Sequence, residues 1–245
     1  MSSDILIEKK YLPNHISIIM DGNNRWYKNN NNNSRLSGHW AGARQARSIT
    51  NYCADLNIKY LTLFVFSSEN WKRSKKEVNA LLDLFFTALQ NKEIKKLHKR
   101  NIRINFIGNR QNFSNKITDR MQAAEKLTRN NTGLLVNIAA NYGGRWDVVN
   151  AIRRISLKVG RAELKADEIN EELVGSFIAL GDIPDPDLCI RTGGEKRLSN
   201  FLLWHFAYTE FYFTDILWPD FSNKEFDTAL EFYSKIHRRF GASGT

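Results

Sequence analysis

A polar stretch able to bind a metal-bridged anion follows a short apolar run near the start of the chain. The run, residues 16–20, predicts a buried strand that ends in a loop. The loop offers a carboxylate, a glycine, two amides and a guanidinium, which belong to Asp21, Gly22, Asn23, Asn24 and Arg25. A glycine beside asparagines lets backbone N–H groups turn toward an anion, and the arginine fork matches phosphate oxygens.

Asp21 gives this loop two interpretations. A carboxylate repels a bound anion unless a divalent cation lies between them, and Mg²⁺ held by one or two carboxylates and substrate phosphates is the usual arrangement. Asp21 also stands where the carboxyl end of a strand meets a ligand in an open α/β sheet. The pattern fits a Mg²⁺–diphosphate site, and it equally fits an Asx-turn in which Asp21 only caps the loop.

Two later stretches offer similar chemistry. Residues 67–73 (Ser-Ser-Glu-Asn-Trp-Lys-Arg) lie between a predicted strand and a predicted helix, whose N-terminus would favour an anion; helix capping is the alternative. Residues 191–199 (Arg-Thr-Gly-Gly-Glu-Lys-Arg-Leu-Ser) place two glycines between arginines after another strand. In a parallel sheet all three loops would meet at one edge. Glu210 opens a further strand and is either a second metal ligand or an edge-strand charge.

The elements that must position these loops alternate between strand and helix patterns. Strand-like runs cover residues 16–20, 60–66, 102–107, 134–140, 188–190 and 210–213. Helical patterns cover residues 40–56 and 74–100, and capping boxes at Ser74/Glu77 and Ser222/Glu225 open the second of these helices and the last helix of the chain. The alternation predicts an α/β fold, a single domain over residues 1–245 with a central, mostly parallel sheet flanked by helices.

Two segments stand apart from this pattern. Residues 28–34 contain five consecutive asparagines, which cannot pack a core and have low helix propensity, so we expect a flexible loop. This loop is either a lid over the anion site or ordinary loop variation. Residues 1–11 read as an N-terminal extension.

Composition limits the class of protein. The net charge of +10 suits diphosphates, an anionic membrane surface or nucleic acid, and so decides nothing alone. The two cysteines, Cys53 and Cys189, lack the spacing of a zinc site or a disulfide framework. Since no apolar stretch approaches the roughly 18 residues of a membrane span, we expect a cytoplasmic protein that can still touch a membrane peripherally.

Several ordered motifs resemble one family. They are Met20-Asp-Gly-Asn-Asn-Arg-Trp26, Gly38-His39, Phe66-Ser-Ser-Glu-Asn-Trp71, Asn137-Ile-Ala-Ala-Asn-Tyr-Gly-Gly-Arg145, Arg191-Thr-Gly-Gly-Glu195, Ser199-Asn-Phe-Leu-Leu-Trp204 and Trp218-Pro-Asp-Phe221. Together they are similar to the cis-prenyltransferases of the undecaprenyl diphosphate synthase family, over nearly the whole chain. The resemblance implies a homodimeric, Mg²⁺-dependent enzyme. It would add isopentenyl diphosphate units in cis onto farnesyl diphosphate and make a cell-wall lipid carrier, undecaprenyl diphosphate.

The resemblance also implies residue roles. Asp21 and Glu210 would hold the metal, with Asp21 the main catalytic acid and Asn70 the proposed proton acceptor. The substrate-binding positions are Gly22, Asn23, Asn24, Arg25, Trp26, Arg35 and His39 toward the allylic diphosphate, Ser67, Ser68, Glu69, Trp71 and Arg73 near the reacting carbons, and Arg191, Arg197, Leu198 and Ser199 toward isopentenyl diphosphate. The apolar face of residues 74–100 would be either ordinary core or the wall of a tunnel that receives the growing chain.

The sequence departs from the family pattern at three positions. Asn24 replaces a second glycine, and asparagine tolerates a positive φ better than most residues. Ser74 stands where proline is common, and Lys196 replaces a histidine that some members use near the metal. None of these changes removes a named charge.

Two rival classes can be weighed. A non-catalytic partner subunit of the same fold should have lost Asp21 or the Arg-Thr-Gly-Gly motif, and both are present. A nucleic-acid binder should show a helix-turn-helix, aromatic side chains on an RNA-binding sheet or a basic helix. The one basic cluster, residues 92–103, reads as a solvated face that can meet anionic lipid, so we expect no nucleic acid.

Overall fold

A six-stranded parallel sheet forms the centre of the computed structural model, which describes residues 12–29 and 35–236. The strand order is β3-β4-β2-β1-β5-β6, and every pair of neighbours is parallel. The strands are β1 (His15–Ile19), β2 (Tyr60–Ser67), β3 (Arg103–Ile107), β4 (Leu135–Tyr142), β5 (Leu188–Arg191) and β6 (Glu210–Phe213). The predicted α/β fold is confirmed, and the carboxyl ends of the strands share one edge.

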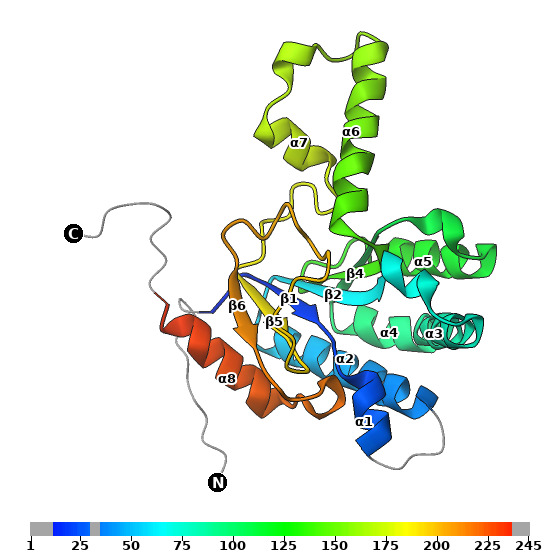
Figure 1. Ribbon diagram of the computed structural model, residues 1–245, viewed down its shortest axis with the longest axis vertical. Helices are drawn as coiled ribbons and strands as arrows, with labels where there is room; N and C mark the ends of the chain where they lie inside the picture. The colour runs from blue at the N-terminus through cyan, green and yellow to red at the C-terminus, as the bar shows by residue number, and fades with distance from the viewer. Residues whose placement is uncertain (1–11, 30–34, 237–245) are drawn as a thin grey trace.

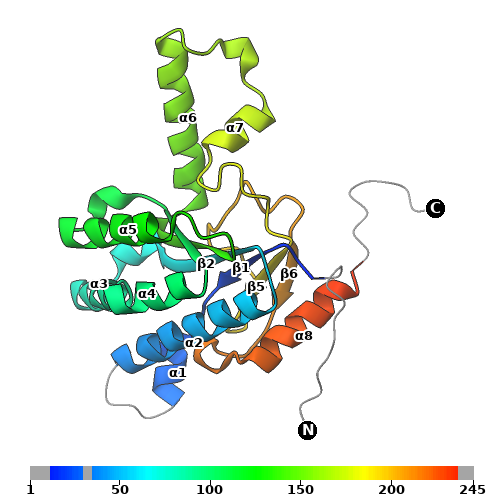
Figure 2. The same cartoon turned by 180° about the vertical axis from the view of Figure 1, so that it is seen from behind.

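Helices pack against one face and the β3 edge of this sheet (Figure 1). The α-helices are α1 (Asn23–Asn29), α2 (Arg35–Asp55), α3 (Lys75–Ala88), α4 (Asn91–Lys99), α5 (Asn115–Thr128), α6 (Gly144–Gly160), α7 (Glu171–Phe177) and α8 (Asn223–Ser234). Short 3₁₀ turns are η2 (Ser68–Lys72), η3 (Arg110–Asn112), η4 (Ala166–Glu168) and η5 (Trp218–Asp220). In both views α6 and α7 form an arm that projects from the body (Figures 1 and 2).

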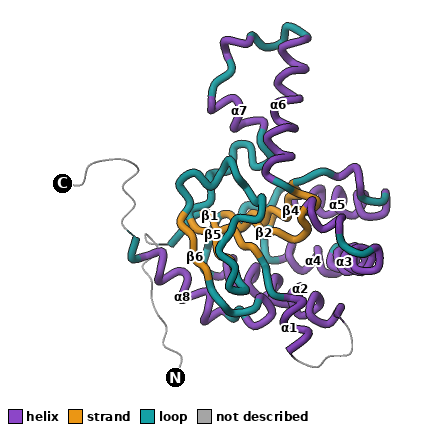
Figure 3. Tube along the Cα trace, in the orientation of Figure 1, coloured by secondary structure: helices purple, strands orange, loops and turns teal. Residues whose placement is uncertain are grey.

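Successive side chains of β1 point to opposite faces of the sheet and pack in two different hydrophobic cores. Ile16 and Ile18 face one side, where they pack with residues of α2 and α8 such as Ile49 and Phe226. Ile19 faces the other side and joins a cluster with Phe201. This second face is covered by the long loops around β5 and β6 rather than by a regular helix (Figure 3). A third cluster joins α3, α4 and α5 to β3 at the sheet's edge.

Local sequence signals set several helix starts. The hydroxyl oxygens of Ser74 and Ser222 accept hydrogen bonds from the backbone N–H groups of Glu77 and Glu225, at 3.3 and 3.4 Å. The serine half of each predicted capping box is therefore confirmed.

The helix predicted over residues 74–100 is wrong as a single element. It is divided into α3 and α4 at Leu89 and Gln90, where the chain turns to an extended conformation without glycine or proline. Leu89 and Ile94 are both buried in the same cluster, so tertiary packing rather than a local breaker decides the division.

The predicted loop over residues 28–34 is also wrong at its start. Lys28 and Asn29 are the last residues of α1, a short helix that begins directly after the Asp21–Gly22 turn. Residues 30–34 and the extension of residues 1–11 lie outside the described residues. No helix among the residues that the structure describes is long and apolar enough to cross a membrane.

Candidate active site

Asp21 brings the first and the last of the three predicted loops together. It lies just beyond the end of β1, and Ile19 of that strand pairs with Arg191 of β5. The Asp21 carboxylate contacts two guanidinium groups, Arg25 at 3.3 Å and Arg191 at 3.0 Å. The hydroxyl of Thr192 donates to the backbone carbonyl oxygen of Asp21 at 2.8 Å. Two segments 170 residues apart in sequence thus form one charged centre.

Two glycines allow this close approach. Gly22 has φ +110°, and a Cβ there would lie 2.9 Å from Leu217. Gly193 has φ +85°, and a Cβ there would lie 2.5 Å from an Arg25 nitrogen. Both positions need glycine for backbone conformation and for space. Asn24 lies inside α1 and is not among the described residues with positive φ, so the tolerance of asparagine for a positive φ is not needed there.

The late loop is organised by the buried side chain of Arg191. Its Nη1 donates to the Ser199 hydroxyl at 2.7 Å and to the carbonyl oxygen of Arg197. Arg197 itself is exposed, and its guanidinium pairs with Glu195. Leu198 is half-buried, and Lys196 is exposed. The loop therefore holds one fixed guanidinium and one that can move toward a ligand.

The middle loop folds into η2 at the carboxyl end of β2. The side-chain amide oxygen of Asn70, Oδ1, accepts the backbone N–H of Ser67 at 2.9 Å, so Asn70 caps η2. The indole of Trp71 donates to Asn141 at 2.8 Å. Glu69 accepts a hydrogen bond from Asn200 at 2.8 Å and connects this loop to the late one.

Hydrogen bonding decides the charge of Glu69. Partial burial acts to raise the pKa of Glu69, but hydrogen bonds from Asn200, Ser68 and Ser67 together lower it below its usual value. Asn200 also accepts the backbone N–H of Arg145 at 2.9 Å. Asn200 belongs to the Ser199–Trp204 motif, but the sequence alone gave it no role. Its position beside Ser199 was the available signal.

Glu77 joins α1 to α3 at the same edge. One of its carboxylate oxygens accepts from Asn24 at 3.3 Å and from Arg73 at 2.8 Å. Burial, assisted by the charge of Arg73, lowers the pKa of His39 below its usual value, so this imidazole is neutral near pH 7. Trp26 donates from its indole to Asp220 at 2.7 Å. Arg35 begins α2, but its side chain lies outside the described part of the chain.

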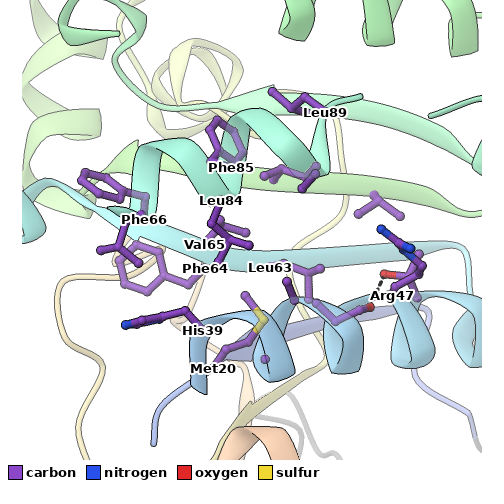
Figure 4. Close-up of a pocket in the computed structure, with 18 of the residues that line it drawn as sticks. Met20, His39, Arg47, Leu63, Phe64, Val65, Phe66, Leu84, Phe85 and Leu89 are labelled. Atoms are coloured by element: carbon purple, nitrogen blue, oxygen red, sulfur yellow. Dashed lines mark hydrogen bonds between the residues drawn. The ribbon is translucent and has the colours of Figure 1, made fainter. Parts of the chain in front are cut away.

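An apolar cavity begins beside these polar groups. It lies between α2, α3, α4 and the sheet, and the empty space within it and in the open solvent at its mouth together measures about 1240 Å³. Asn23 and His39 line one end, and Arg47 and Glu93 line another part (Figure 4). The side chains between them are almost all apolar: Met20, Leu63, Phe64, Val65, Phe66, Leu81, Leu82, Leu84, Phe85, Leu89, Ile94, Leu97, Ile104, Val136 and Ile138.

Small residues of α2 make room for this cavity. Ala43 and Ala46 lie between His39 and Arg47 on the face of the helix that lines it. The eight-residue separation of His39 and Arg47 corresponds to about 12 Å along the helix axis. Figure 4 shows these two side chains well apart along α2, with Arg47 at the right of the labelled residues and His39 toward the left.

Several buried polar atoms at this edge have no hydrogen-bond partner. Among the described residues they are Asn23 Oδ1, Asn24 Oδ1, His39 Nε2 and Arg191 Nε. Buried polar groups normally have partners, so this set fits a site completed by a polar ligand. One carboxylate at the centre, Asp21, also fits Mg²⁺, which takes one or two carboxylates and completes its shell with phosphate oxygens and water.

Glu210 does not belong to this cluster in the described chain. It is the first residue of β6 and pairs with Leu188, the first residue of β5. Because the strands are parallel, Glu210 lies at the edge opposite the one where Asp21 and Arg191 meet, roughly 10 Å away along the strand. Strand register therefore does not bring Glu210 and Asp21 together within one chain, and the role of Glu210 as a metal ligand stays a prediction.

Comparisons with known proteins identify the family to which this chain belongs. The family model for undecaprenyl diphosphate synthase matches residues 19–241. The chain is 51% identical over 232 residues to a (2E,6E)-farnesyl-diphosphate-specific ditrans,polycis-undecaprenyl-diphosphate synthase of Photorhabdus laumondii, covering 95% of this chain and 91% of the relative. An enzyme of the same name from Pasteurella multocida is 48% identical and covers 97% of this chain and 98% of the relative.

A solved structure shows the same architecture. Lavandulyl diphosphate synthase from Lavandula x intermedia, in complex with dimethylallyl diphosphate, superposes with a TM-score of 0.91 at 36% identity. The match covers 95% of this chain and 99% of that one.

Proposed function

Because this chain belongs to the undecaprenyl diphosphate synthase family, we propose that it adds isopentenyl diphosphate units in cis to farnesyl diphosphate and makes undecaprenyl diphosphate. The observation that carries the proposal is the continuity of two chemically different spaces. A cationic centre around Asp21, Arg25 and Arg191 adjoins an apolar cavity. A lipid with a diphosphate head and a growing isoprenoid tail needs both.

The two loops that meet at Asp21 suit two diphosphates. Arg25 and the first turn of α1, whose N–H groups lack intrahelical partners, would bind the allylic diphosphate. Arg191, Ser199 and Arg197 would bind isopentenyl diphosphate. Holding both substrates at one centre places their reacting carbons within reach and removes most of the entropic barrier to their meeting.

Ionisation of the allylic substrate releases a diphosphate, so negative charge develops at this edge. Arg25 is close enough to Asp21 to change partners and follow that charge. Asp21 is the residue that would hold Mg²⁺, which when bound supplies Lewis-acid stabilisation of the departing diphosphate. The apolar walls around Phe64 and Phe66 exclude water from the reacting carbons.

The last step removes a proton from the condensed chain. Asn70 was assigned this role by resemblance, but its side-chain oxygen Oδ1 already accepts the Ser67 N–H. An amide is a weak base, and the departing diphosphate would be a stronger one. The proton-acceptor role of Asn70 stays a prediction, and its capping of η2 supports a positioning role.

A homodimer forms part of the proposal. The arm of α6 exposes Val149, Ile152 and Leu157, of which Leu157 is 61% exposed. Exposed apolar side chains gathered on one projecting element are typical of an interface. We expect a second copy of the chain to cover this arm.

The test is a condensation assay with labelled isopentenyl diphosphate, farnesyl diphosphate and Mg²⁺, followed by chromatography of the dephosphorylated lipid. The proposal expects a product of undecaprenyl length, loss of activity in EDTA and recovery when Mg²⁺ is added. Full activity in EDTA would contradict the metal-bridged arrangement. A product that never exceeds one condensation step would contradict chain elongation.

A further inference from the structure

Helix α4 has two chemically different faces. Ile94 and Leu97 line the apolar cavity, and Ile94 is only 5% exposed. The outward side carries cations on α4 and just after it, and we call them the α4 basic face: Lys92, Lys95, Lys96, Lys99, Arg100 and Arg103. The four lysines follow the spacing of one helical stripe, so they project together.

Most of this charge is not neutralised locally. Lys96 pairs with Glu93 at 3.2 Å, and Arg100 pairs with Asp55. The ion pairs of the described residues include none with Lys92, Lys95, Lys99 or Arg103. Glu93 itself turns toward Arg47 at the cavity, at 2.6 Å. The face therefore has a clear excess of positive charge.

The α4 basic face lies on the outer side of the cavity wall, away from the cationic centre. The cationic centre lies at the carboxyl edge of the sheet, whereas Arg103 begins β3 and lies at the opposite edge. Between them is the cavity, one wall of which is the inner side of α4. If the proposed function holds, the tail of the product lies directly beneath the α4 basic face. A long isoprenoid chain cannot stay in water, so it needs an apolar phase close to this wall.

From this arrangement we propose that the α4 basic face docks on an anionic lipid bilayer, which receives the product. Anionic headgroups complement the unpaired lysines, and each basic side chain near such a surface adds favourable binding energy. The contact is peripheral, because no described helix can span a membrane. This inference rests on the proposed function for its purpose, but the binding itself can be measured separately.

The test is co-sedimentation of the full-length protein with vesicles of three parts phosphatidylcholine to one part phosphatidylglycerol. Vesicles of phosphatidylcholine alone serve as the neutral surface. We expect binding to the anionic vesicles only, weakening as salt rises because screening shortens the reach of each charge. The variant Lys92→Gln, Lys95→Gln, Lys99→Gln should bind roughly fivefold more weakly per lysine, on the order of a hundredfold in total.

A matched control tests whether vesicle binding depends on the α4 basic face or only on the net charge of the protein. The variant Lys158→Gln, Lys165→Gln, Lys224→Gln changes three exposed lysines on α6, the following loop and α8, and both variants lower the net charge from +10 to +7. In Figures 1 and 2 the α6 arm lies away from α4. The control should bind like the natural chain. Equal loss in both variants, or equal binding to neutral vesicles, would overturn the proposal.

A second readout distinguishes the two proposals. Condensation in detergent should be unchanged in the α4 variant, since none of its three lysines lines the cavity. Stimulation of turnover by anionic vesicles should be lost in that variant alone. Vesicle binding without condensation would overturn the proposed function and leave docking supported. Condensation without vesicle binding, or tighter binding of a mixed-sequence DNA duplex to the same lysines, would overturn docking.

Discussion

At the scale of single residues, Asp21 organises the site because it is the one carboxylate shared by the two loops. Its carboxylate oxygens contact Arg25 and Arg191. A diphosphate and its cation would compete for the same three groups. The charges are thus already in place, and binding changes their partners rather than assembling them.

Replacing Asp21 with Ala should lower kcat by several orders of magnitude without unfolding the protein. Loss of a metal ligand at a step that develops charge typically costs several kcal/mol. Steady-state kinetics measure the effect, with thermal unfolding as the check on folding and Asp83→Ala, on the outer part of α3, as the control. If the variant kept more than about a tenth of the natural kcat, Asp21 would not be the residue that holds the catalytic metal.

Arg25 and Arg191 should affect different substrates. Arg191→Ala should chiefly raise KM for isopentenyl diphosphate, and Arg25→Ala should chiefly weaken the allylic substrate. An arginine–phosphate contact is worth on the order of 1.5–3 kcal/mol, which corresponds to roughly ten- to hundredfold effects. Substrate titrations of both variants, with Arg197→Ala as a third, test this. Equal changes in both KM values would mean one composite anion site, since both guanidinium groups contact Asp21.

At the scale of elements, α2 sets the width of the apolar cavity. Its small residues Ala43 and Ala46 stand opposite the bulkier side chains of α3, including Phe85. The division of the predicted long helix into α3 and α4 also shapes the cavity, because α4 can then pack over β3 with Ile94 and Leu97 inward.

Ala46→Leu should shorten the product. The larger side chain would occupy space that the tail needs, while the diphosphate loops are unchanged. Chromatography of the extracted lipids should show shorter chains with the first condensation still proceeding. The matched control is Ala123→Leu, on the exposed side of α5. Ala162→Leu would not serve, because Ala162 has a positive φ and a larger side chain there would strain the backbone. An unaltered product length would place the tail elsewhere.

At the scale of the whole molecule, the buried imidazole of His15 connects stability to pH. His15 is 0% exposed, and its ring nitrogens lie 2.6 Å from the Pro184 carbonyl oxygen and 2.7 Å from the Thr62 hydroxyl. Burial is the largest cause of the fall in the pKa of His15 to about 4. The His15 imidazole therefore takes up a proton near pH 6.5 in the unfolded chain, but only near pH 4 in the folded chain.

Stability should accordingly fall as pH drops from about 6.5 toward 4, by about 3 kcal/mol from this residue alone. Urea unfolding at a series of pH values measures the slope. His15→Gln should flatten the slope over that range even if it lowers stability at pH 7, and His98→Gln, which alters an exposed histidine, should leave the slope unchanged. An unchanged slope in His15→Gln would show that other groups cause the acid sensitivity.

The α6 arm should determine assembly. Ile152 is 53% exposed on this projecting helix. Ile152→Asp should convert a dimer to a monomer in analytical ultracentrifugation, because a charge in an apolar interface is costly to bury. Arg153→Asp, its exposed neighbour, is the comparison. A natural chain that sediments as a monomer at all concentrations would contradict the expected homodimer.

The amino-acid sequence alone was enough to predict the strands, two helix caps and the edge where two of the loops meet. Period and composition indicated the strands, the caps at Ser74 and Ser222 were readable from four-residue patterns, and the parallel order brought the loops of Asp21 and Arg191 to one edge. These features depend on neighbours in the chain or on one rule of sheet topology, so single-sequence reasoning reaches them.

Three-dimensional packing set the remaining features of the fold and of the site. It ended α3 at Leu89 through burial, moved Glu210 to the opposite edge through strand register, and bonded Asn200 to Glu69 across the site. It also left the cavity between α2, α3 and α4, whose existence depends on how separate helices are spaced. No short pattern encodes such distances, because each results from contacts between segments that are far apart in the chain.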